Sequence, residues 1–193
     1  MTIRGRVFGA AVIVAMAVLC VEVAVAQAPA RGGGGRAGGA AAGTAPQGDL
    51  LQVMRGILFP NSNVIFAAQT QDPAAVKKDA DPTASTNPMA SLYGGWQAIE
   101  NSGIAIAESA SLLTMAGRAC SNGKPVPVRN ADWQRFVREL RTAGMAAYKA
   151  GQSKDMDKVV EVSDTVATAC MNCHEVYREK TPAQGGDAAR CTK

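Results

Sequence analysis

The feature that most constrains the fold is a run of apolar and small residues whose spacing alternates between four and three. Its members are Leu92, Trp96, Ile99, Gly103, Ile106, Ala110, Leu113 and Gly117. Residues spaced in this way share one face of an α-helix, because the helix completes a turn in about 3.6 residues. The run predicts a helix with one buried face, and its small members leave room for something bulky beside it.

Two later segments repeat this periodicity. The first opens with Asp132 as the expected cap and buries five positions: Trp133, Val137, Leu140, Gly144 and Ala147. The last begins near Ser153 or Asp155 and keeps seven positions in register: Met156, Val160, Ser163, Ala167, Cys170, His174 and Tyr177. Both segments predict amphipathic helices.

An earlier segment, from Asp49, puts Leu51, Met54 and Leu58 on one face and then meets Pro60. Proline removes a backbone donor and its ring clashes with the preceding turn, so we expect a kink or break there. A second short helical piece would start at Asn61 or Ser62 and run through Ala68.

Clear breakers separate the four segments, at 72–88, 121–130 and 150–153, and strand patterns are absent from the sequence. One long and two short connections between four helices favour antiparallel neighbours. The sequence therefore predicts an all-α fold, an antiparallel up-and-down four-helix bundle.

The N-terminus predicts export. Arg4 and Arg6 precede an apolar run that is too short to span a membrane, and a small-residue cleavage pattern follows it, so residues 1–26 are expected to leave as a signal peptide. Residues 27–48 form a Gly/Ala-rich leader, and residues 49–193 suffice for one domain. The mature chain is expected in the periplasm, without a membrane-spanning segment.

Charge excludes one class of partner. Removal of Arg4, Arg6 and Glu22 from the 20 basic and 16 acidic residues leaves 18 and 15, a net charge of +3. The basic residues are scattered and are not interleaved with aromatic ones, so the sequence does not predict a nucleic-acid-binding surface.

The residues that carry chemistry are Cys170-Met171-Asn172-Cys173-His174, the attachment pattern for c-type haem. On a helix, residues three and four apart share a face, so both thiols reach the vinyl groups along one haem edge while His174 meets the iron. One covalent haem c is therefore expected, bound to Cys170 and Cys173 and ligated by His174.

Other interpretations of the motif fit less well. A thioredoxin-like redox pair expects strands around the helix. A structural zinc site needs four ligands, and the remaining candidates, Cys120 and Cys191, are not spaced as a second ligand pair. A chance pair of core cysteines does not explain why the only histidine of the chain lies beside them.

A bundle whose fourth helix ends in this motif resembles the class II c-type cytochromes, the cytochrome c prime family, over most of 49–180. The resemblance implies periplasmic electron transfer through Fe(II)/Fe(III) cycling between redox protein partners, or binding of small gases such as NO or CO where iron lacks a sixth ligand. An enzyme such as a peroxidase is not expected, because His174 is the only histidine and no distal histidine is available to move protons. The family often dimerises, and Gly94, Gly95, Gly103 and Ala107 suggest a homodimer through the first two helices.

The sixth ligand is expected to be Met54. In an antiparallel bundle the start of the first helix lies at the haem end. The other methionines of the mature chain lie at the far end, turn away from the inward face or, for Met171, lie inside the attachment motif on the side of His174. Met54 also resembles the methionine of a Leu-x-x-Met run in the methionine-ligated branch of the family. The alternatives are that Met54 only packs on the haem, or that Pro60 moves the first helix and leaves the site open.

Cys120 closes the second helix and Cys191 follows the fourth, and both lie at the same end of the expected bundle. A disulfide between them suits an oxidising compartment, with free thiols as the alternative.

Overall fold

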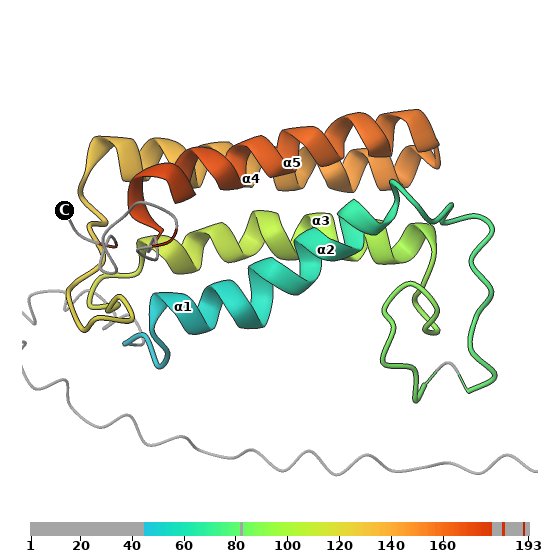
Figure 1. Ribbon diagram of the computed structural model, residues 1–193, viewed down its shortest axis with the longest axis horizontal. Coiled ribbons are helices and arrows are strands. Elements are labelled where there is room, and N and C mark those ends of the chain that lie inside the picture. Colours follow the sequence, from blue (N-terminus) through green and yellow to red (C-terminus); the bar gives the residue numbers. More distant parts are fainter. Residues whose placement is uncertain (1–44, 82, 179–182, 184–190, 192–193) are drawn as a thin grey trace, which may run out of the picture. The chain divides into compact units, whose positions relative to one another are not determined.

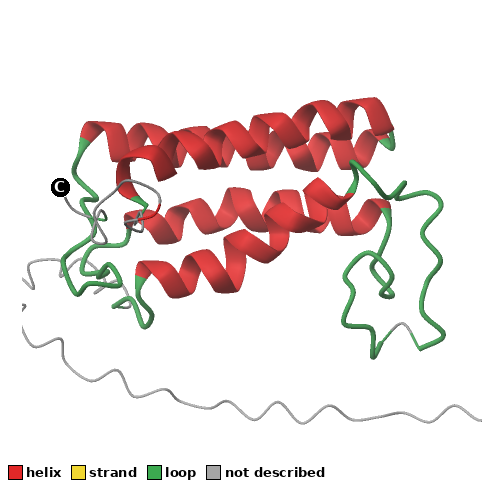
Figure 2. Cartoon of the chain, viewed as in Figure 1, coloured by secondary structure: helices red, strands yellow, loops and turns green. Residues whose placement is uncertain are grey.

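The computed structural model describes residues 45–81, 83–178, 183 and 191. The expected signal peptide, residues 1–26, and almost all of the expected leader lie outside the described residues. The described part is helical and contains no strand, so the all-α class is confirmed (Figure 2). Its elements are α1 (Leu50–Val53), the π turn η1 (Met54–Leu58), α2 (Phe59–Ala67), α3 (Trp96–Ser109), the 3-10 turn η2 (Ala110–Thr114), α4 (Ala131–Ser153) and α5 (Met156–Tyr177).

The sequence predicts a kink or break of the first helix at Pro60. In the structure the helix is instead distorted one turn earlier. Asp49 caps α1 by accepting a hydrogen bond from the backbone of Gln52, whose side chain bonds the Asp49 backbone in return. The chain then makes the π turn η1, in which the N–H of Phe59 donates to the carbonyl of Met54. Pro60 lies in the first turn of α2, where no donor is needed. The helix axis changes direction between α1 and α2 (Figure 1). The sequence therefore predicted the bend correctly but placed it at Pro60, one turn too late.

The small residues of α3 receive a neighbouring backbone. A Cβ built on Gly103 would lie 2.4 Å from the backbone nitrogen of Tyr148, and one on Gly144 would lie 2.6 Å from that of Ala107. These glycines let α3 and α4 approach closely. The bulky group for which the sequence leaves room beside α3 is therefore α4. Gly103 and Ala107 are buried within the chain, so these two residues are not free to form a dimer face.

The predicted faces of α3 and α4 are largely confirmed. Ile99, Gly103, Ile106, Ala110 and Leu113 are buried, as are all five positions expected for α4. The two ends of the predicted seam are wrong: Leu92 and Gly117 are exposed and lie outside α3 and η2, and Trp96 is half-buried at the start of α3. The N-cap of α4 is Asn130, however, and Asp132 lies inside the first turn. The expected turn at 150–153 is also wrong: α4 continues to Ser153, ends at Lys154 in the left-handed region, and Asp155 caps α5.

The buried face of α5 differs by about one residue from the expected one. Its buried members are Val159, Val162, Ser163, Val166, Ala169 and Tyr177. Of the seven expected positions only Ser163 and Tyr177 are buried; Cys170 and His174 are half-buried, and Val160 is exposed. The cysteine and histidine of the motif therefore lie on a flank of the helix, beside its packed face.

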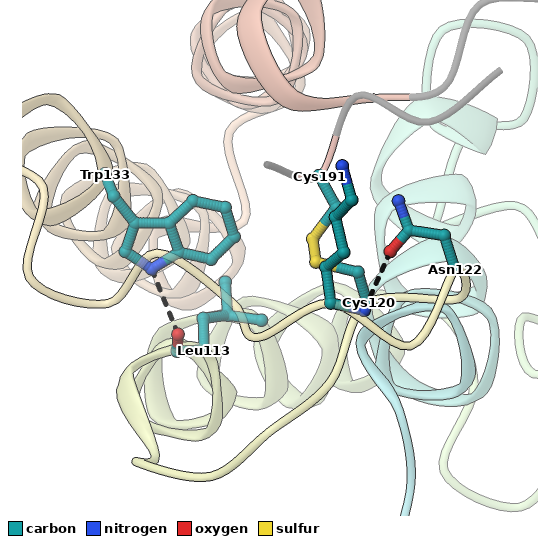
Figure 3. The surroundings of a disulfide bond; sticks show 6 residues. Leu113, Cys120, Asn122, Trp133 and Cys191 are labelled. Carbon is teal, nitrogen blue, oxygen red and sulfur yellow. Dashed lines mark hydrogen bonds between the residues drawn. A yellow bond between two sulfur atoms is a disulfide. The ribbon is translucent and has the colours of Figure 1, made fainter. Parts of the chain in front are cut away.

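Several contacts gather the start of α1, the end of η2, the start of α4 and the end of α5 at one end of the helices, which we call the motif end. The N–H of Leu50 donates to the carbonyl of Ala119 (2.8 Å), and the indole N–H of Trp133 donates to the carbonyl of Leu113 (3.0 Å). Cys120 and Cys191 form a disulfide with a Cα–Cα distance of 5.8 Å, and both are buried (Figure 3). The predicted pairing of these cysteines is confirmed, but Cys120 does not close the second helix as expected, because η2 ends at Thr114 and Cys120 lies in the loop that follows.

Candidate functional site

The last two turns of α5 bring together Cys170, Cys173 and His174. Asp155 begins this helix by accepting a hydrogen bond from the N–H of Lys158, and the helix runs without interruption to Tyr177. Spacings of three and four residues place the two sulfurs and the imidazole on neighbouring parts of one face. All three side chains are half-buried, so they are held in place and still reachable.

A hydrogen bond shows which neighbour this flank of α5 faces. The side chain of Gln69, just after α2, donates to the hydroxyl of Ser163 at 2.8 Å. Cys170 and His174 follow Ser163 by seven and eleven residues, about two and three helical turns, so they lie on the same flank. The flank that carries the motif therefore faces the side of the first helix.

The first helix does not cover that flank along its whole length. α2 packs against α5 and α3, whereas η1 packs against α3. Figure 1 shows α1 well separated from the end of α5, while the end of α2 approaches α5. The motif thus occupies the part of α5 from which the first helix diverges, and this accounts for the partial exposure of Cys170 and His174.

Burial keeps both motif thiols protonated. It raises the pKa of Cys170, and it raises the pKa of Cys173 to about 12, with further contributions from Cys170, Asp132 and Glu139. A thiol is a weak nucleophile compared with its thiolate. A rapidly exchanging redox pair would need a lowered pKa, so these two cysteines do not have the properties of a thioredoxin-like site.

His174 is a neutral imidazole at neutral pH. Burial lowers its pKa, and the positive charge of Arg178 one turn later lowers it further. A neutral imidazole has a free nitrogen lone pair, which is the form that binds a transition metal. The environment of His174 therefore suits a metal ligand.

Met54 comes from a different helix. It is half-buried at the first position of η1 and packs against the core at the motif end. The same helix bends there, so the residue expected as sixth ligand lies where the first helix diverges from α5. Two observations relate Met54 to His174. Both residues lie at the motif end, and the flank of α5 that carries His174 faces the side of the first helix.

The sequence did not identify the contacts that hold the end of α5. The phenol of Tyr177 accepts a hydrogen bond from the side chain of Asn130 at 3.3 Å, and its ring meets those of Trp133 and Phe136 edge-on, with centroids 5.0 and 6.3 Å away. Tyr177 follows Cys173 by one turn. These partners lie more than 40 residues away in the chain, so the helical spacing of α5 gave no signal of them.

A surface groove runs between α4 and α5, beside the motif. It has a volume of about 570 Å³, and its wall includes Arg135, Arg138, Asp164 and Asn172. Asn172, which lies inside the motif, donates to Glu139 at 3.4 Å. The lining contains neither Cys170 nor His174, which lie on another flank of α5.

Two findings bear on other kinds of site. Cys120 and Cys191 are joined to each other, so they are not ligands of a zinc ion shared with the motif. Among the described residues, no three His, Cys, Asp or Glu side chains gather as a metal site, and no helix has the length and apolarity to cross a membrane.

Comparisons with protein-family models, with curated proteins and with solved structures found no match to this chain.

Proposed function

We propose that this protein is a monohaem c-type cytochrome that transfers electrons in the periplasm. The observation that carries the proposal is the half-open flank of α5, on which Cys170, Cys173 and a neutral His174 lie together within reach of a flat ligand. The α1–α2 unit, α3, α4 and α5 would then form an antiparallel four-helix bundle around the haem, with the first helix covering its second face.

Each residue has its own task. Cys170 and Cys173 would hold the haem through thioether bonds, and His174 would bind its iron. Met54 is the proposed sixth ligand, because η1 lies at the motif end and on the side that His174 faces. The haem supplies a one-electron Fe(II)/Fe(III) couple. The chain keeps both ligands in place, so no acid, base or nucleophile is required.

Tyr177 and its neighbours support the rigidity that such a carrier needs. They fix the last turn of α5 to α4, so the two sulfurs and the imidazole stay in one geometry when the electron arrives or leaves. The buried disulfide between Cys120 and Cys191 is consistent with an oxidising compartment. It also agrees with the proposal that residues 1–26 direct export.

The test is covalent haem content. The full-length chain is expressed with export and with a haem-attachment system, unfolded, and extracted with acidified acetone. The wild type should keep its haem. The Cys170→Ser/Cys173→Ser variant should lose it, and the matched Cys120→Ser/Cys191→Ser variant, which also lacks two sulfurs, should keep it. A colourless wild type, or haem that is extracted from it, would contradict the proposal.

Carbon monoxide separates electron transfer from gas binding in the haem-containing protein. A six-coordinate ferrous form with sharp bands that do not respond to carbon monoxide is expected for the electron carrier. Rapid binding of carbon monoxide would indicate an open sixth position and would favour a gas-binding haem protein with the same attachment site.

A further inference from the structure

The charged side chains of the described residues are sorted by sign along the helices. Residues 45–59, 103–142 and 167–178 make up the half of the helices at the motif end, the motif half. Residues 60–81, 83–102 and 143–166 make up the other half, the far half. Proximity across helices defines each half: the N–H of Leu50 donates to the carbonyl of Ala119 in the motif half, and Gly151 lies close to Glu100 in the far half, where an added Cβ would be 3.0 Å from the Glu100 backbone nitrogen.

Every described arginine lies in the motif half. The seven arginines and one lysine of this half are Arg55, Arg118, Arg129, Arg135, Arg138, Arg141, Arg178 and Lys124. Its five acidic residues are Asp49, Glu108, Asp132, Glu139 and Glu175. Eight positive and five negative charges leave the motif half at +3.

The far half has the opposite sign. Its five basic residues are all lysines, Lys77, Lys78, Lys149, Lys154 and Lys158. Its eight acidic residues are Asp72, Asp79, Asp81, Glu100, Asp155, Asp157, Glu161 and Asp164. The far half therefore has a charge of −3, and the described residues form a neutral unit that is strongly polarised along its helices.

Several of the motif-half arginines are directed to solvent. Arg118 is buried and donates to the carbonyls of Leu112 and Gly48, so it is structural. Arg129 and Arg138 are exposed, and neither is in an ion pair within the described residues. Met171, inside the attachment motif, is 61 % exposed. The motif is therefore at the surface of the positive half.

We propose that the motif half is a docking face for an acidic surface on a partner protein, with the partner an electron donor or acceptor as the proposed function requires. Charge separation of this kind orients a molecule during encounter and raises the association rate with a partner of opposite charge. Arginine is suited to this contact because its planar guanidinium pairs with a carboxylate through two hydrogen bonds.

A bound haem leaves the polarity in place. Its two propionates would reduce the charge of the motif half from +3 to +1, while the far half stays at −3. The exposed arginines come from η1, the loop before α4, α4 and the C-cap of α5, so several elements contribute positive charge to the motif half. A partner that approaches with an acidic surface is thereby brought to the end where the electron enters or leaves.

The test compares two variants with the same change of net charge. Arg129→Glu/Arg138→Glu reverses two exposed arginines of the motif half, and Lys77→Glu/Lys149→Glu reverses two exposed lysines of the far half. Fluorescent poly-L-glutamate is the acidic probe, and its anisotropy is measured with full-length protein at low and high salt. We expect the arginine variant to bind at least about tenfold more weakly than wild type, and the lysine variant to stay within about twofold.

The outcomes are distinct. Equal weakening by both variants would show that only net charge matters and would overturn the docking face. Binding to phosphatidylglycerol vesicles but not to poly-L-glutamate would overturn it in favour of a membrane surface. Since the readout does not depend on haem, a colourless chain that shows the expected difference would end the cytochrome proposal and leave the acidic-partner face standing.

Discussion

The phenol of Tyr177, in the last turn of α5, donates a hydrogen bond of 2.7 Å to Oδ1 of Asp132, in the first turn of α4. Tyr177 is 5 % exposed, and it follows His174 by three residues and Cys173 by four. The bond therefore joins the turn that carries the motif to the neighbouring helix. Its loss should affect both stability and the geometry of the site.

Replacement of Tyr177 by Phe should lower the free energy of unfolding by about 2 kcal/mol, because the ring stays and a hydrogen bond to a charged group is lost. Denaturant unfolding followed by circular dichroism measures this. Tyr148→Phe is the matched control, since the Tyr148 hydroxyl accepts an exposed bond from Gln152, and it should cost less than about 0.5 kcal/mol. Equal losses in the two variants would show that the Tyr177–Asp132 hydrogen bond contributes no more to the free energy of unfolding than an exposed hydrogen bond does.

The same contact predicts a pH dependence. Burial raises the pKa of Tyr177, the bond from Asn130 opposes this, and Asp132 adds to it. The folded chain therefore holds the phenolic proton more tightly than the unfolded chain. The resulting stability is fully present below pH about 10 and is lost as the pH rises through the raised pKa. Tyr177→Phe should make the stability less dependent on pH in this range, as measured by unfolding at pH about 9 to 11.

Because α3 and α4 pack closely, alanine in place of glycine should lower stability at their contact but not in η1. Gly103→Ala places a methyl group 2.4 Å from the backbone nitrogen of Tyr148, so the helices must separate, and we expect a loss of about 1 to 3 kcal/mol. Gly56, in η1, serves as the control, because a Cβ at this position would have no atom within 4 Å. Gly56→Ala should be neutral or stabilise by up to about 1 kcal/mol, since alanine favours helix. Similar melting temperatures for the two variants would contradict this.

The parts of the fold that follow from local spacing could be predicted from the sequence. The seam from Ile99 to Leu113 and the buried face of α4 are correct because each repeats an apolar or small residue every three or four positions. The motif itself needs only five consecutive residues. In contrast, the face of α5 was misplaced because alanines and valines occupy two adjacent stripes, and packing against the other helices buries the stripe with Val159 and Val166.

Tertiary context decided the rest. Pro60 indicated a break, but a helix can absorb a proline through a π turn one turn earlier, and this depends on how η1 packs on α3. The glycines of α3 indicated a space for a bulky group, yet Gly103 receives the backbone of α4. The bond of Tyr177 to Asp132 joins residues 45 positions apart, which no periodicity reveals.

The proposed axial ligand predicts a spectral change. Met54→Ala should convert a low-spin haem to a form that binds carbon monoxide, and it should lower the reduction potential, because a methionine ligand raises it. Met156→Ala is the control, since Met156 is half-buried at the start of α5, in the far half. Visible spectra with and without carbon monoxide measure the change. Bands that are the same in wild type and Met54→Ala would reject Met54 as a ligand.

The reactivity of Cys173 separates the haem-free chain from the haem-bearing one. With a pKa of about 12 in place of 9.0, the folded haem-free thiol has roughly a thousandfold less thiolate at pH about 8, so alkylation by iodoacetamide should be slow. In a chain that begins at residue 27, and so lacks Cys20, the Cys120→Ser/Cys191→Ser background leaves only the motif thiols to react. There urea should restore a fast rate, because unfolding removes the burial that raises the pKa. The haem-bearing chain should stay unlabelled even in urea, since both sulfurs are then thioethers. Fast labelling of the folded haem-free chain would show that burial does not protect the thiol, and labelling of the haem-bearing chain in urea would show that the sulfurs are not bonded to haem.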